Sequence, residues 1–193
     1  GWHVRQGEAA FAGTPEAPVL EVRSVEGAVE TIEAAQYLVA TGSHPWAPPI
    51  DGLEEAGYLT STTAMELDEV PESMLILGGG YVALEMAQLF SRLGSRVTML
   101  VRSRLASQEE PEASKALAGV FADEGIRVVR RAMADSVASG PDGVSVTANV
   151  AGGEEVFRAS RILVALGRRP VTKGLDLDAV GVKTGASGEI VVD

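Results

Sequence analysis

The spacing of apolar residues switches twice between strand-like and helix-like periods in the middle of the chain. Strands are expected at 74–77, where all four residues are apolar, and at 96–101 and 126–129, and helical spacing fills 81–94 and 111–124 between them. Alternating strands and helices of this kind predict a βαβαβ unit with a parallel sheet and right-handed crossovers. The sequence therefore indicates an α/β fold with a Rossmann-like parallel sheet.

Two helix signals refine this picture. The apolar face of the first long helix is expected to consist of Val82, Met86, Leu89 and Leu93. Gly94 follows as a residue suited to ending that helix. Upstream, Thr63 and Glu66 fit the two ends of a capping box for a short helix, which Pro71 prevents from continuing.

Short strands with turn signals stand on both sides of this unit. The strands expected before it are 4–11, 19–24, 29–33 and an apolar run at 37–41. The strands expected after it are 133–139, 144–150, 154–158 and an apolar run at 161–166. The pattern predicts two three-stranded meanders, each followed by a buried strand. A proline-rich stretch at 45–59 has neither period and marks a boundary between the two parts.

Both apolar runs lead into the same short motif. LVATGSHP occupies 38–45 and LVALGRRP occupies 163–170. Because each copy follows a meander, the two are expected to close two units of related design. In the second unit a glycine-rich turn begins at Gly78, and the same spacing counted back from Gly42 falls before the first residue. The sequence thus predicts a front half upstream of this chain, and a continuation of the strand-like end SGEIVVD downstream.

Composition excludes several classes of function. The formal charge of -11 argues against nucleic-acid and anionic-membrane partners, which require clustered cations. Apolar runs are too short for a membrane helix and there is no leader pattern, so we expect a cytoplasmic location. The absence of cysteine excludes a disulfide or a thiolate site within the chain. His3 and His44 are far apart and lack nearby acids at ligand spacing, so no metal site is expected.

The turn between the first strand and the first long helix has the pattern Gly78-x-Gly80-x-x-Ala83. Gly78 permits a tight turn, Gly80 leaves room for a pyrophosphate near the backbone, and Ala83 lets the helix pack closely on the strand. The helix N-terminus adds free N–H groups and a partial positive charge. The pattern predicts a dinucleotide site, with a purely structural glycine turn as the alternative.

The end of the second strand favours NADP(H) over NAD(H). No acid stands at its tip to bind a ribose 2′-hydroxyl, and Arg102 and Arg104 follow. Guanidinium groups suit a 2′-phosphate, and an ordinary solvated strand end is the alternative. Glu85 lies one helical turn after Tyr81, on the same face near the dinucleotide end. Three further acids are interpreted as helix-start residues that favour the helix dipole: Glu109, Glu110 and Glu112.

Three segments together carry a family resemblance. They are ILGGGYVALEMAQLFSRLGSRVTMLVR, YLVATGSHPWAPPIDGL and LVALGRRP. In this order they resemble the flavin-dependent pyridine nucleotide-disulfide oxidoreductases, and the match covers essentially the whole chain. Within the family, TSTTAMELDEVPE and VALEMAQLFSRLGS look most like the mercuric reductase branch.

The resemblance implies a parent enzyme in which an NADPH-binding domain interrupts an FAD-binding domain and a dimerisation domain follows. Residues 1–58 would be the later part of the FAD domain, 59–168 the NADPH domain, and 169–193 the return into the FAD domain. The implied reaction passes a hydride from NADPH to FAD and then, through a cysteine pair outside this chain, reduces Hg(II). The alternatives are a disulfide reductase of the glutathione reductase or dihydrolipoamide dehydrogenase type, and a free-standing NADP(H)-binding module without redox activity.

The resemblance also assigns residues by position. For NADPH it implies Gly78, Gly80, Tyr81, Val82, Glu85, Arg102, Arg104 and Gly167. For FAD it implies Ala9, Thr41, Gly42 and Arg168. Arg102 would bind the 2′-phosphate with help from Arg104, Tyr81 would cover the flavin, and Glu85 would lie beside the nicotinamide. One departure is Gln108, which stands where the family pattern has a second phosphate-binding arginine.

Overall fold

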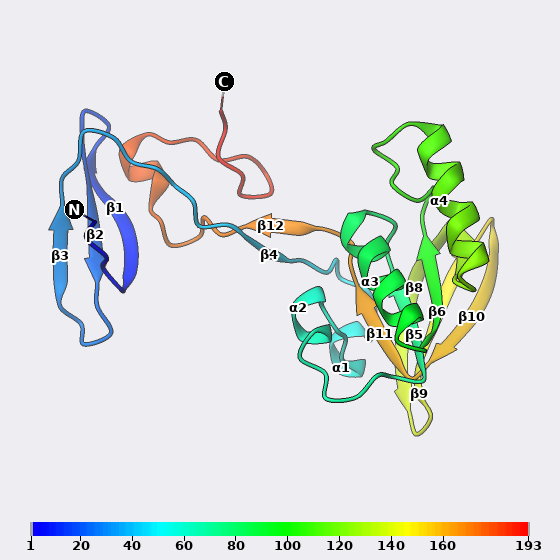
Figure 1. Cartoon of the computed structure of the whole chain (residues 1–193). Coiled ribbons are helices and arrows are strands. Elements are labelled where there is room, and N and C mark those ends of the chain that lie inside the picture. Colours follow the sequence, from blue (N-terminus) through cyan, green and yellow to red (C-terminus); the bar gives the residue numbers. More distant parts are fainter. Residues whose placement is uncertain (1, 193) are drawn as a thin grey trace. The chain divides into compact units, whose positions relative to one another are not determined.

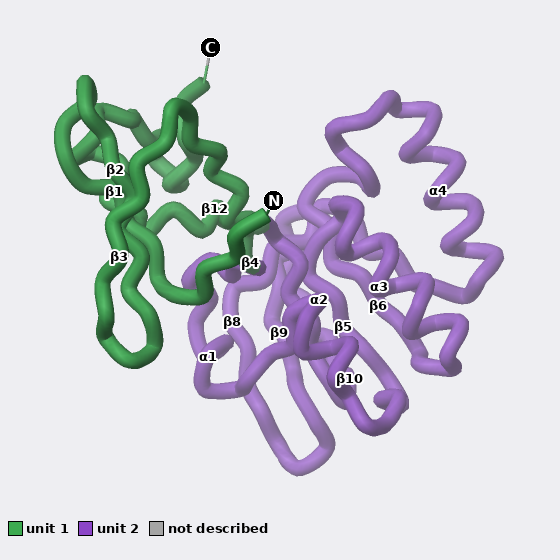
Figure 2. The backbone as a smooth tube through the Cα atoms, turned by 60° about the vertical axis from the view of Figure 1, so that its left-hand side comes forward, with its two compact units in different colours: residues 1–44, 168–193 green, residues 45–167 purple. Residues whose placement is uncertain are grey.

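The computed structural model describes residues 2–192, which divide into two compact units. One is Pro45–Gly167, which we call the central unit. The other combines the chain up to His44 with the chain from Arg168 onward, and we call it the outer unit. Figure 2 shows the two in different colours. The chain therefore leaves the outer unit once and returns to it once.

A four-stranded parallel sheet forms the middle of the central unit, as the alternating pattern predicts. Its strands are β5 (Ser73–Leu77), β6 (Arg96–Val101), β7 (Arg127–Arg130) and β11 (Arg161–Val164). Their order is β11-β5-β6-β7, and all neighbours run parallel. Since β6 lies on one side of β5 and β11 on the other, β5 is a central strand. The α/β fold class is confirmed.

Both faces of this sheet are covered (Figure 1). One face carries α3 (Tyr81–Arg92) and α4 (Pro111–Asp123), and the other carries an antiparallel meander of β8 (Ala132–Gly140), β9 (Gly143–Val150) and β10 (Gly153–Ala159). In β5, Met74 and Ile76 pack in the cluster with the helices, whereas Leu75 and Leu77 pack in the cluster with the meander. A strand between two apolar layers reads as a continuous apolar run, which is why 74–77 contains no polar residue.

The buried face of α3 differs from the predicted one. The fully buried residues are Ala83, Leu84, Ala87 and Phe90. Val82, Met86 and Leu89 are half-buried, and Leu93 is 54% exposed just after the helix. The prediction was correct in part: Met86 and Leu89 pack against the core cluster, but the prediction followed the largest apolar side chains and so missed the residues that are buried deepest. The helix instead turns its two alanines toward the sheet, where small side chains allow a closer approach.

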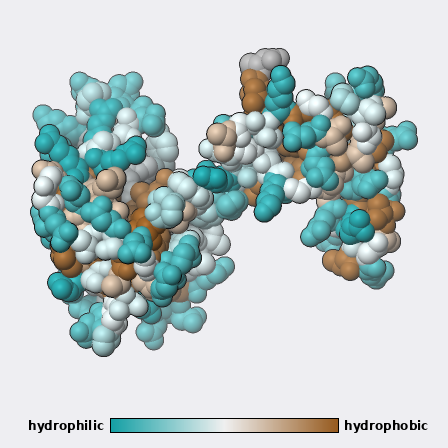
Figure 3. Space-filling model, turned by 180° about the vertical axis from the view of Figure 1, so that it is seen from behind, coloured by the Kyte–Doolittle hydropathy of each residue, from teal (hydrophilic) through white to brown (hydrophobic). Residues whose placement is uncertain are grey.

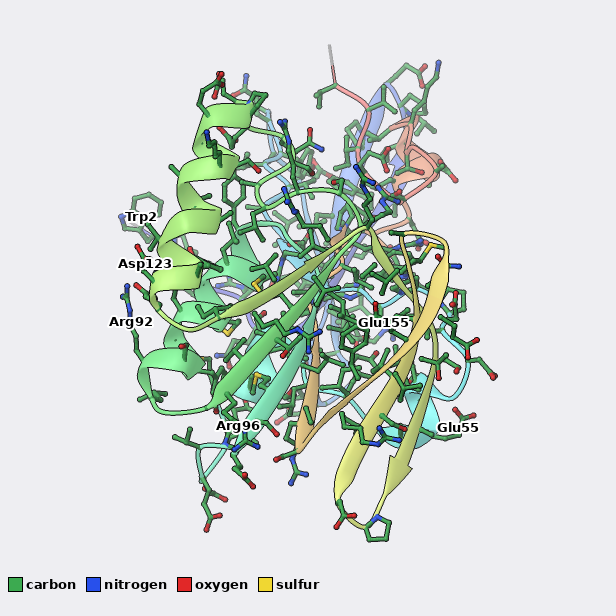
Figure 4. The ribbon with its side chains drawn as sticks, turned by 90° about the vertical axis from the view of Figure 1, so that its right-hand side faces the viewer. Trp2, Glu55, Arg92, Arg96, Asp123 and Glu155 are labelled. Carbon is green, nitrogen blue, oxygen red and sulfur yellow. The ribbon has the colours of Figure 1, made fainter. Side chains whose placement is uncertain are left out.

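Glu124, just after α4, joins the two long helices. Gln88 Nε2 lies 3.0 Å from both carboxylate oxygens of Glu124, and Arg92 Nη2 lies 2.6 Å from Oε1. The hydrogen bond from Arg92 is the largest of the causes that lower the pKa of Glu124. Figure 4 shows Arg92 and Asp123 at the adjoining helix ends. These bonds link the ends of α3 and α4. Surface ion pairs of this kind contribute little free energy to folding.

The proline-rich connection folds with the central unit. It contains the short helix α1 (Leu53–Ala56), and Leu53 is 1% exposed in the cluster beneath the meander. The N–H of Val137 donates to Asp51 O at 2.8 Å, which ties the connection to β8. Residues 45–58 are thus packed in the central unit, while the sequence grouped them with the preceding domain. Which unit serves which cofactor stays a prediction.

A capping box begins α2 (Ser61–Ala64), but not at the predicted residues. The Oγ1 of Thr60 accepts a hydrogen bond from the N–H of Thr63 at 3.2 Å, and the Oγ1 of Thr63 accepts one from the N–H of Thr60 at 2.9 Å. The prediction that paired Thr63 with Glu66 was wrong. A threonine hydroxyl serves here as the reciprocal acceptor, so the box begins three residues earlier.

The outer unit contains the first predicted meander. Its strands β1 (Glu8–Thr14), β2 (Ala17–Arg23) and β3 (Val29–Ile32) are antiparallel in the order β1-β2-β3. Phe11 packs against the 3-10 helix η1 (Leu177–Val180), and its N–H donates to Leu175 O at 2.8 Å. The rings of Phe11 and Tyr37 meet edge to face with centroids 5.3 Å apart. Segments from both ends of the chain thus share one small core.

Two strands predicted in the outer unit are not formed. Residues 37–41 have no strand, and Leu38 is 91% exposed. The sheets within residues 2–192 contain no neighbour for this segment, so its backbone lacks the ladder that would define a strand. The ending SGEIVVD forms a single bridge between Ile190 and Thr184. Its last residue, Asp193, lies outside the described residues.

The two copies of the Gly-x-x-Pro motif lie side by side. Residues Ser43–Pro45 form β4 and residues Arg168–Pro170 form β12, and these two short strands pair with each other (Figure 1). Arg168 Nε donates to Ser43 Oγ at 2.8 Å. The motif therefore marks the two places where the chain crosses between the units.

Within residues 2–192, no helix has the length and apolar character needed to cross a bilayer. Figure 3 shows a mostly hydrophilic face with apolar residues scattered among the polar ones. Scattered apolar side chains are ordinary on protein surfaces.

Leu53→Ala is expected to destabilise the central unit by about 2–5 kcal/mol, because it leaves a cavity in a packed cluster. The matched change Leu38→Ala removes the same atoms from an exposed position and should shift the free energy of unfolding by less than about 0.5 kcal/mol. Urea unfolding followed by circular dichroism measures both. Equal effects of the two changes would contradict the packing of residues 45–58 on the meander.

Candidate functional site

Three loops of the central unit meet where its parallel strands end. Residues 78–80 follow β5, residues 102–110 follow β6, and residues 165–167 follow β11. In open α/β sheets, ligands bind outside the carboxyl ends of the strands, at the point where connections leave a central strand in opposite directions. The order β11-β5-β6-β7 puts that point at the end of β5. The candidate site therefore lies at the start of α3.

Gly78 allows β11 to end directly beside the turn. Its φ is 134°, and a Cβ at this position would lie 2.3 Å from the carbonyl oxygen of Ala165. The N–H of Ala165 donates to Leu77 O at 2.9 Å, which fixes the two chain segments against each other. Any residue with a side chain would force them apart. Gly78 thus has the tight-turn role that the sequence pattern indicates.

The next two glycines have opposite surroundings. A Cβ on Gly79 would lie 2.6 Å from Val101 Cγ1, so this glycine is required by packing against β6. A Cβ on Gly80 would meet nothing within 4 Å. The sequence pattern left Gly79 unassigned, although the run of three glycines was the available signal. Gly80 faces open space, as a position that a pyrophosphate approaches should.

The N-terminus of α3 points its free N–H groups into that open space. Gly80 is the N-cap in an extended conformation, and no side chain caps the helix. The first bond of the helix runs from the N–H of Leu84 to Gly80 O at 3.0 Å, so the helix itself does not use the N–H groups of residues 81–83. Together with the helix dipole, these donors favour an anion such as a phosphate.

The loop after β6 is fixed to both the glycine turn and α4. The N–H of Ala106 donates to Gly79 O at 2.7 Å, and Leu105 and Ala106 are buried. The buried hydroxyl of Ser114 donates to Leu105 O. Ala106 has a φ of 45°, a conformation that this set of contacts holds in place. The loop is thus a built part of the site, and sequence patterns gave no sign of its anchors.

The two arginines of this loop differ in their surroundings. Arg104 Nη2 donates to Ser107 O at 3.0 Å and to Glu109 O at 2.6 Å, so its guanidinium stabilises the loop. Arg102 is exposed, and no acidic side chain within residues 2–192 pairs with it. Arg102 is therefore the loop cation that is available to a ligand.

Tyr81, the first residue of α3, holds the end of the same loop. Its hydroxyl donates to the carboxylate of Glu109, and this hydrogen bond is the largest cause that raises the pKa of Tyr81. The ring is 60% exposed, and Glu85 is exposed one turn further along. The sequence interpreted Glu109 as a helix-start acid, but Glu110 is the N-cap of α4 and Glu109 reaches back to Tyr81 instead.

Gly167 lies at the same edge of the sheet, beyond the end of β11. Its φ is 156°, it is exposed, and its carbonyl oxygen accepts a hydrogen bond from the N–H of Trp46 at 3.0 Å. Since β11 and β5 are parallel and Val164 pairs with Leu77, residues 165–167 run beside the glycine turn. The structure thus brings the glycine turn, Arg102 and Gly167 to one edge of the central sheet.

Three of the residues expected at FAD lie together in the outer unit. Thr41 Oγ1 donates to Val171 O at 2.5 Å, and the N–H of Val171 donates to Gly42 O at 3.0 Å. Arg168 donates to Ser43 twice, from Nε to Oγ at 2.8 Å and from Nη2 to the carbonyl oxygen at 2.6 Å. These bonds hold the two crossing segments together.

The fourth FAD residue, Ala9, is half-buried in β1 and belongs to the meander rather than to this hydrogen-bonded set. Within the described parts of the outer unit, the helical structure is the four-residue η1. These residues therefore provide no glycine-rich turn leading into a long helix.

Clusters of metal-binding side chains are not found in the described part of the chain. Across residues 2–192, no three His, Cys, Asp or Glu residues lie close enough to hold a metal ion.

The family model described as pyridine nucleotide-disulphide oxidoreductase matches residues 3–193. The chain belongs to this family, as the three sequence segments predict.

Among curated proteins, the chain is similar to mercuric reductases. It is 55% identical over 193 residues to the enzyme of Streptomyces lividans, covering 100% of this chain and 40% of that protein. It is 36% identical over 194 residues to the enzyme of Staphylococcus aureus, covering 100% of this chain and 34% of that protein. The resemblance to the mercuric reductase branch is confirmed. The chain spans 40% or less of the length of these relatives.

Two solved structures are similar in fold to this chain. The Cu(II) complex of the HOCl-induced flavoprotein disulfide reductase RclA from Escherichia coli has a TM-score of 0.83 at 28% identity, covering 97% of this chain and 41% of that one. LpdA from Mycobacterium tuberculosis has a TM-score of 0.86 at 26% identity, covering 99% of this chain and 42% of that one. The fold is thus shared with flavoprotein disulfide reductases.

Gly78→Ala is expected to destabilise the central unit by several kcal/mol, because the new methyl group collides with the Ala165 carbonyl at a positive φ. Gly80→Ala adds the same group in open space, and its effect on stability should be below about 1 kcal/mol. Thermal unfolding of the two variants measures the contrast. A Gly78→Ala chain as stable as the Gly80→Ala chain would show that the close approach of β11 is not required.

Glu109→Gln is expected to lower the pKa of Tyr81, because it removes the carboxylate that holds the phenol in its protonated form. A raised folded-state pKa means that this contribution to stability is full below the pKa of unfolded tyrosine and is lost as the pH rises through the folded value. Phenolate absorbance during alkaline titration measures the shift, with Glu110→Gln as the control. An unchanged titration in the Glu109 variant would disprove the interaction.

Proposed function

We propose that the chain is the nicotinamide-binding part of a longer FAD-dependent oxidoreductase that uses NADPH. The observation that carries this proposal is the combination of three glycines, of which two are required by packing and one faces open space at the start of α3. A turn that served packing alone would not require a glycine at position 80, where a side chain would meet no neighbour. The open N-terminus next to an available cation fits a dinucleotide with a pyrophosphate.

The preference for NADPH over NADH rests on the loop after β6. No acid at the end of β6 is available for a ribose 2′-hydroxyl, and Arg102 is exposed and not paired with an acidic side chain within the described chain. A guanidinium group donates two parallel hydrogen bonds to a phosphate. Because Arg104 is engaged with two carbonyl oxygens of its own loop, we assign the phosphate to Arg102 and give Arg104 the task of shaping the loop.

The residues at the start of α3 would position the reacting end of the cofactor. When bound, NADPH supplies the hydride. The N–H groups of residues 81–83, Val82 among them, would hold the pyrophosphate, and Gly167 would border the dinucleotide from β11. Tyr81 and Glu85, exposed one turn apart, would face the nicotinamide. The carboxylate of Glu109 orients Tyr81 before any ligand arrives.

The outer unit would supply the remaining part of a flavin site. Thr41, Gly42 and Arg168 lie at the paired crossing segments, where their backbone and side-chain donors could approach the phosphate side of FAD. Ala9 would contact the adenine through its backbone. Since this unit contains no glycine-rich turn within its described residues, binding of FAD requires additional chain.

The terminal acceptor that we propose is Hg(II). The curated relatives are named mercuric reductases, and one is 55% identical over the whole chain. Reduction of Hg(II) to the element takes two electrons, which one hydride carries, and needs soft thiolate ligands for the metal. This chain contains no cysteine, so the thiolates would come from other parts of the protein.

Reduction of a disulfide is the second candidate. One solved structure that shares the fold, RclA from Escherichia coli, is described as a flavoprotein disulfide reductase, at a lower identity of 28%. The two candidates share the nicotinamide chemistry and differ in the residues that receive the electrons. We further propose that the complete protein is a cytoplasmic homodimer whose dimerisation domain is not part of this sequence.

Isothermal titration with NADPH, NADH and FAD tests the nicotinamide assignment. The chain is expected to bind NADPH more tightly than NADH and to take up little FAD. Arg102→Glu should weaken NADPH binding by about 10-fold or more and leave NADH binding nearly unchanged, because only NADPH has the 2′-phosphate. Arg161→Glu, at the opposite end of the parallel sheet, is the charge-matched control. Failure of the unaltered chain to bind either nicotinamide cofactor would rule out the proposed function.

The isolated chain is expected not to oxidise NADPH when Hg(II) is added, with or without FAD. Transfer of electrons to the metal needs thiolates, and the chain has none. Absorbance of NADPH over time measures this directly, with free NADPH and Hg(II) as the background. Protein-dependent turnover by these residues alone would contradict the assignment of the metal chemistry to other parts of the protein.

A further inference from the structure

A surface pocket lies along the edge strand of the parallel sheet. It has a volume of about 580 Å³ and is lined by Ser103, Arg127, Val128, Val129, Arg130 and Arg131. The serine follows β6 and the other residues belong to β7 and its end, so the pocket adjoins the loop that begins at Arg102. Three arginines around one pocket are unusual in a chain with a formal charge of -11. Such a concentration of cations favours an anionic ligand.

Two of these arginines lie at the same sheet edge as the dinucleotide site. Val101, the last residue of β6, pairs with Arg130, the last residue of β7. Arg102 and Ser103 follow the first, and Arg131 follows the second. The carboxyl ends of two neighbouring parallel strands therefore carry three cations within a few residues of one another.

The backbone holds Arg131 in an uncommon conformation. Its φ is 56°, in the left-handed region that residues with a side chain seldom occupy. Its carbonyl oxygen accepts a hydrogen bond from the N–H of Ala151, in the turn after β9, at 3.0 Å. The meander thus fixes the turn from β7 into β8, and with it the backbone positions of Arg130 and Arg131.

Arg130 and Arg131 are available for a ligand, whereas Arg127 is not. Both are exposed, and no acidic side chain in the described part of the chain pairs with either. Arg127 lies at the far end of β7, and its guanidinium carbon is 5.4 Å from the centre of the Phe157 ring, a cation–π contact. At one end of the pocket, Arg130 and Arg131 are not paired with an acidic side chain of the described residues. At the other end, Arg127 already contacts the ring of Phe157.

The available cations in the neighbouring loop are too few for a phosphomonoester. Such a group carries nearly two negative charges and three acceptor oxygens, which more than one guanidinium can bind. Gln108 is uncharged and Arg104 is bonded to carbonyl oxygens, so the loop after β6 offers Arg102 alone. A 2′-phosphate beside Arg102 would therefore need cations from another element.

We propose that Arg130 and Arg131, at the junction of β7 and β8, form the second half of a binding site for the 2′-phosphate of NADPH opposite Arg102. Ser103 follows Arg102 in the chain and lines the pocket together with Arg130 and Arg131, and its hydroxyl would donate a further hydrogen bond. Val128 packs with the helices and Val129 with the meander, so the pocket follows the exposed edge of β7 rather than one of its faces. This inference rests on the proposed binding of NADPH.

The test compares ligands that differ only in the 2′-phosphate. Adenosine 2′,5′-bisphosphate and adenosine 5′-monophosphate, together with NADPH and NADH, are titrated against the full chain and a double variant, Arg130→Gln with Arg131→Asn. Asparagine is chosen because it tolerates the positive φ at position 131. The control is Arg161→Gln with Arg96→Gln, which removes two charges at the opposite end of the parallel sheet. Thermal unfolding of each variant verifies that the chain still folds.

The double variant is expected to lose about 10-fold or more in affinity for NADPH and for the bisphosphate, and less than about twofold for NADH and the monophosphate. The control should change none of these affinities by more than about twofold. Equal losses for ligands with and without the 2′-phosphate would overturn the proposal and indicate a general attraction of anions. Unchanged NADPH binding in a folded double variant would also overturn it, while leaving the proposed function intact. Absence of any nicotinamide binding by the unaltered chain would remove both.

Discussion

The close approach of β11 to the glycine turn is the constraint on which the rest of the central unit depends. A Cβ on Gly78 would lie 2.3 Å from the carbonyl oxygen of Ala165, so the strand from the end of the unit fits beside β5 only because this residue has no side chain. That contact makes β5 a central strand, with connections leaving on both sides. The start of α3 lies at the carboxyl end of this central strand, where Gly80 faces open space and the helix leaves the N–H groups of residues 81–83 unused.

The loop after β6 is rigid because it is held from three directions. Gly79 accepts a hydrogen bond from Ala106, the hydroxyl of Ser114 donates to Leu105, and Arg104 binds two carbonyl oxygens. These contacts consume one of the two arginines that the loop contains. They leave Arg102 exposed, although the chain as a whole is strongly acidic. The electrostatic potential at the carboxyl end of β6 therefore depends on the nearby arginines rather than on the net charge.

The outer unit contains a strand pattern that pairs with no strand among the described residues. Residues 37–41 have the apolar composition of a buried strand, yet Leu38 is 91% exposed, since the described residues contain no strand beside it. The residues that follow this segment, Ser43–Pro45, do form a strand, β4, which pairs with β12. A repeat that is visible in the sequence is thus realised as a pair of crossing segments that lie side by side.

The sequence alone determined the order of strands and helices in the central unit and the position of the glycine turn, because periodicity and the conformational freedom of glycine are local properties. It did not determine which residues of α3 are buried deepest. Ala83 and Ala87 face the sheet because their small side chains allow the helix to approach it closely, and that distance is set by tertiary packing. The partnership of Tyr81 with Glu109 and the different roles of Arg102 and Arg104 were also decided by tertiary contacts. Whether a charged side chain is available to a ligand depends on neighbours that the chain brings together only when it folds.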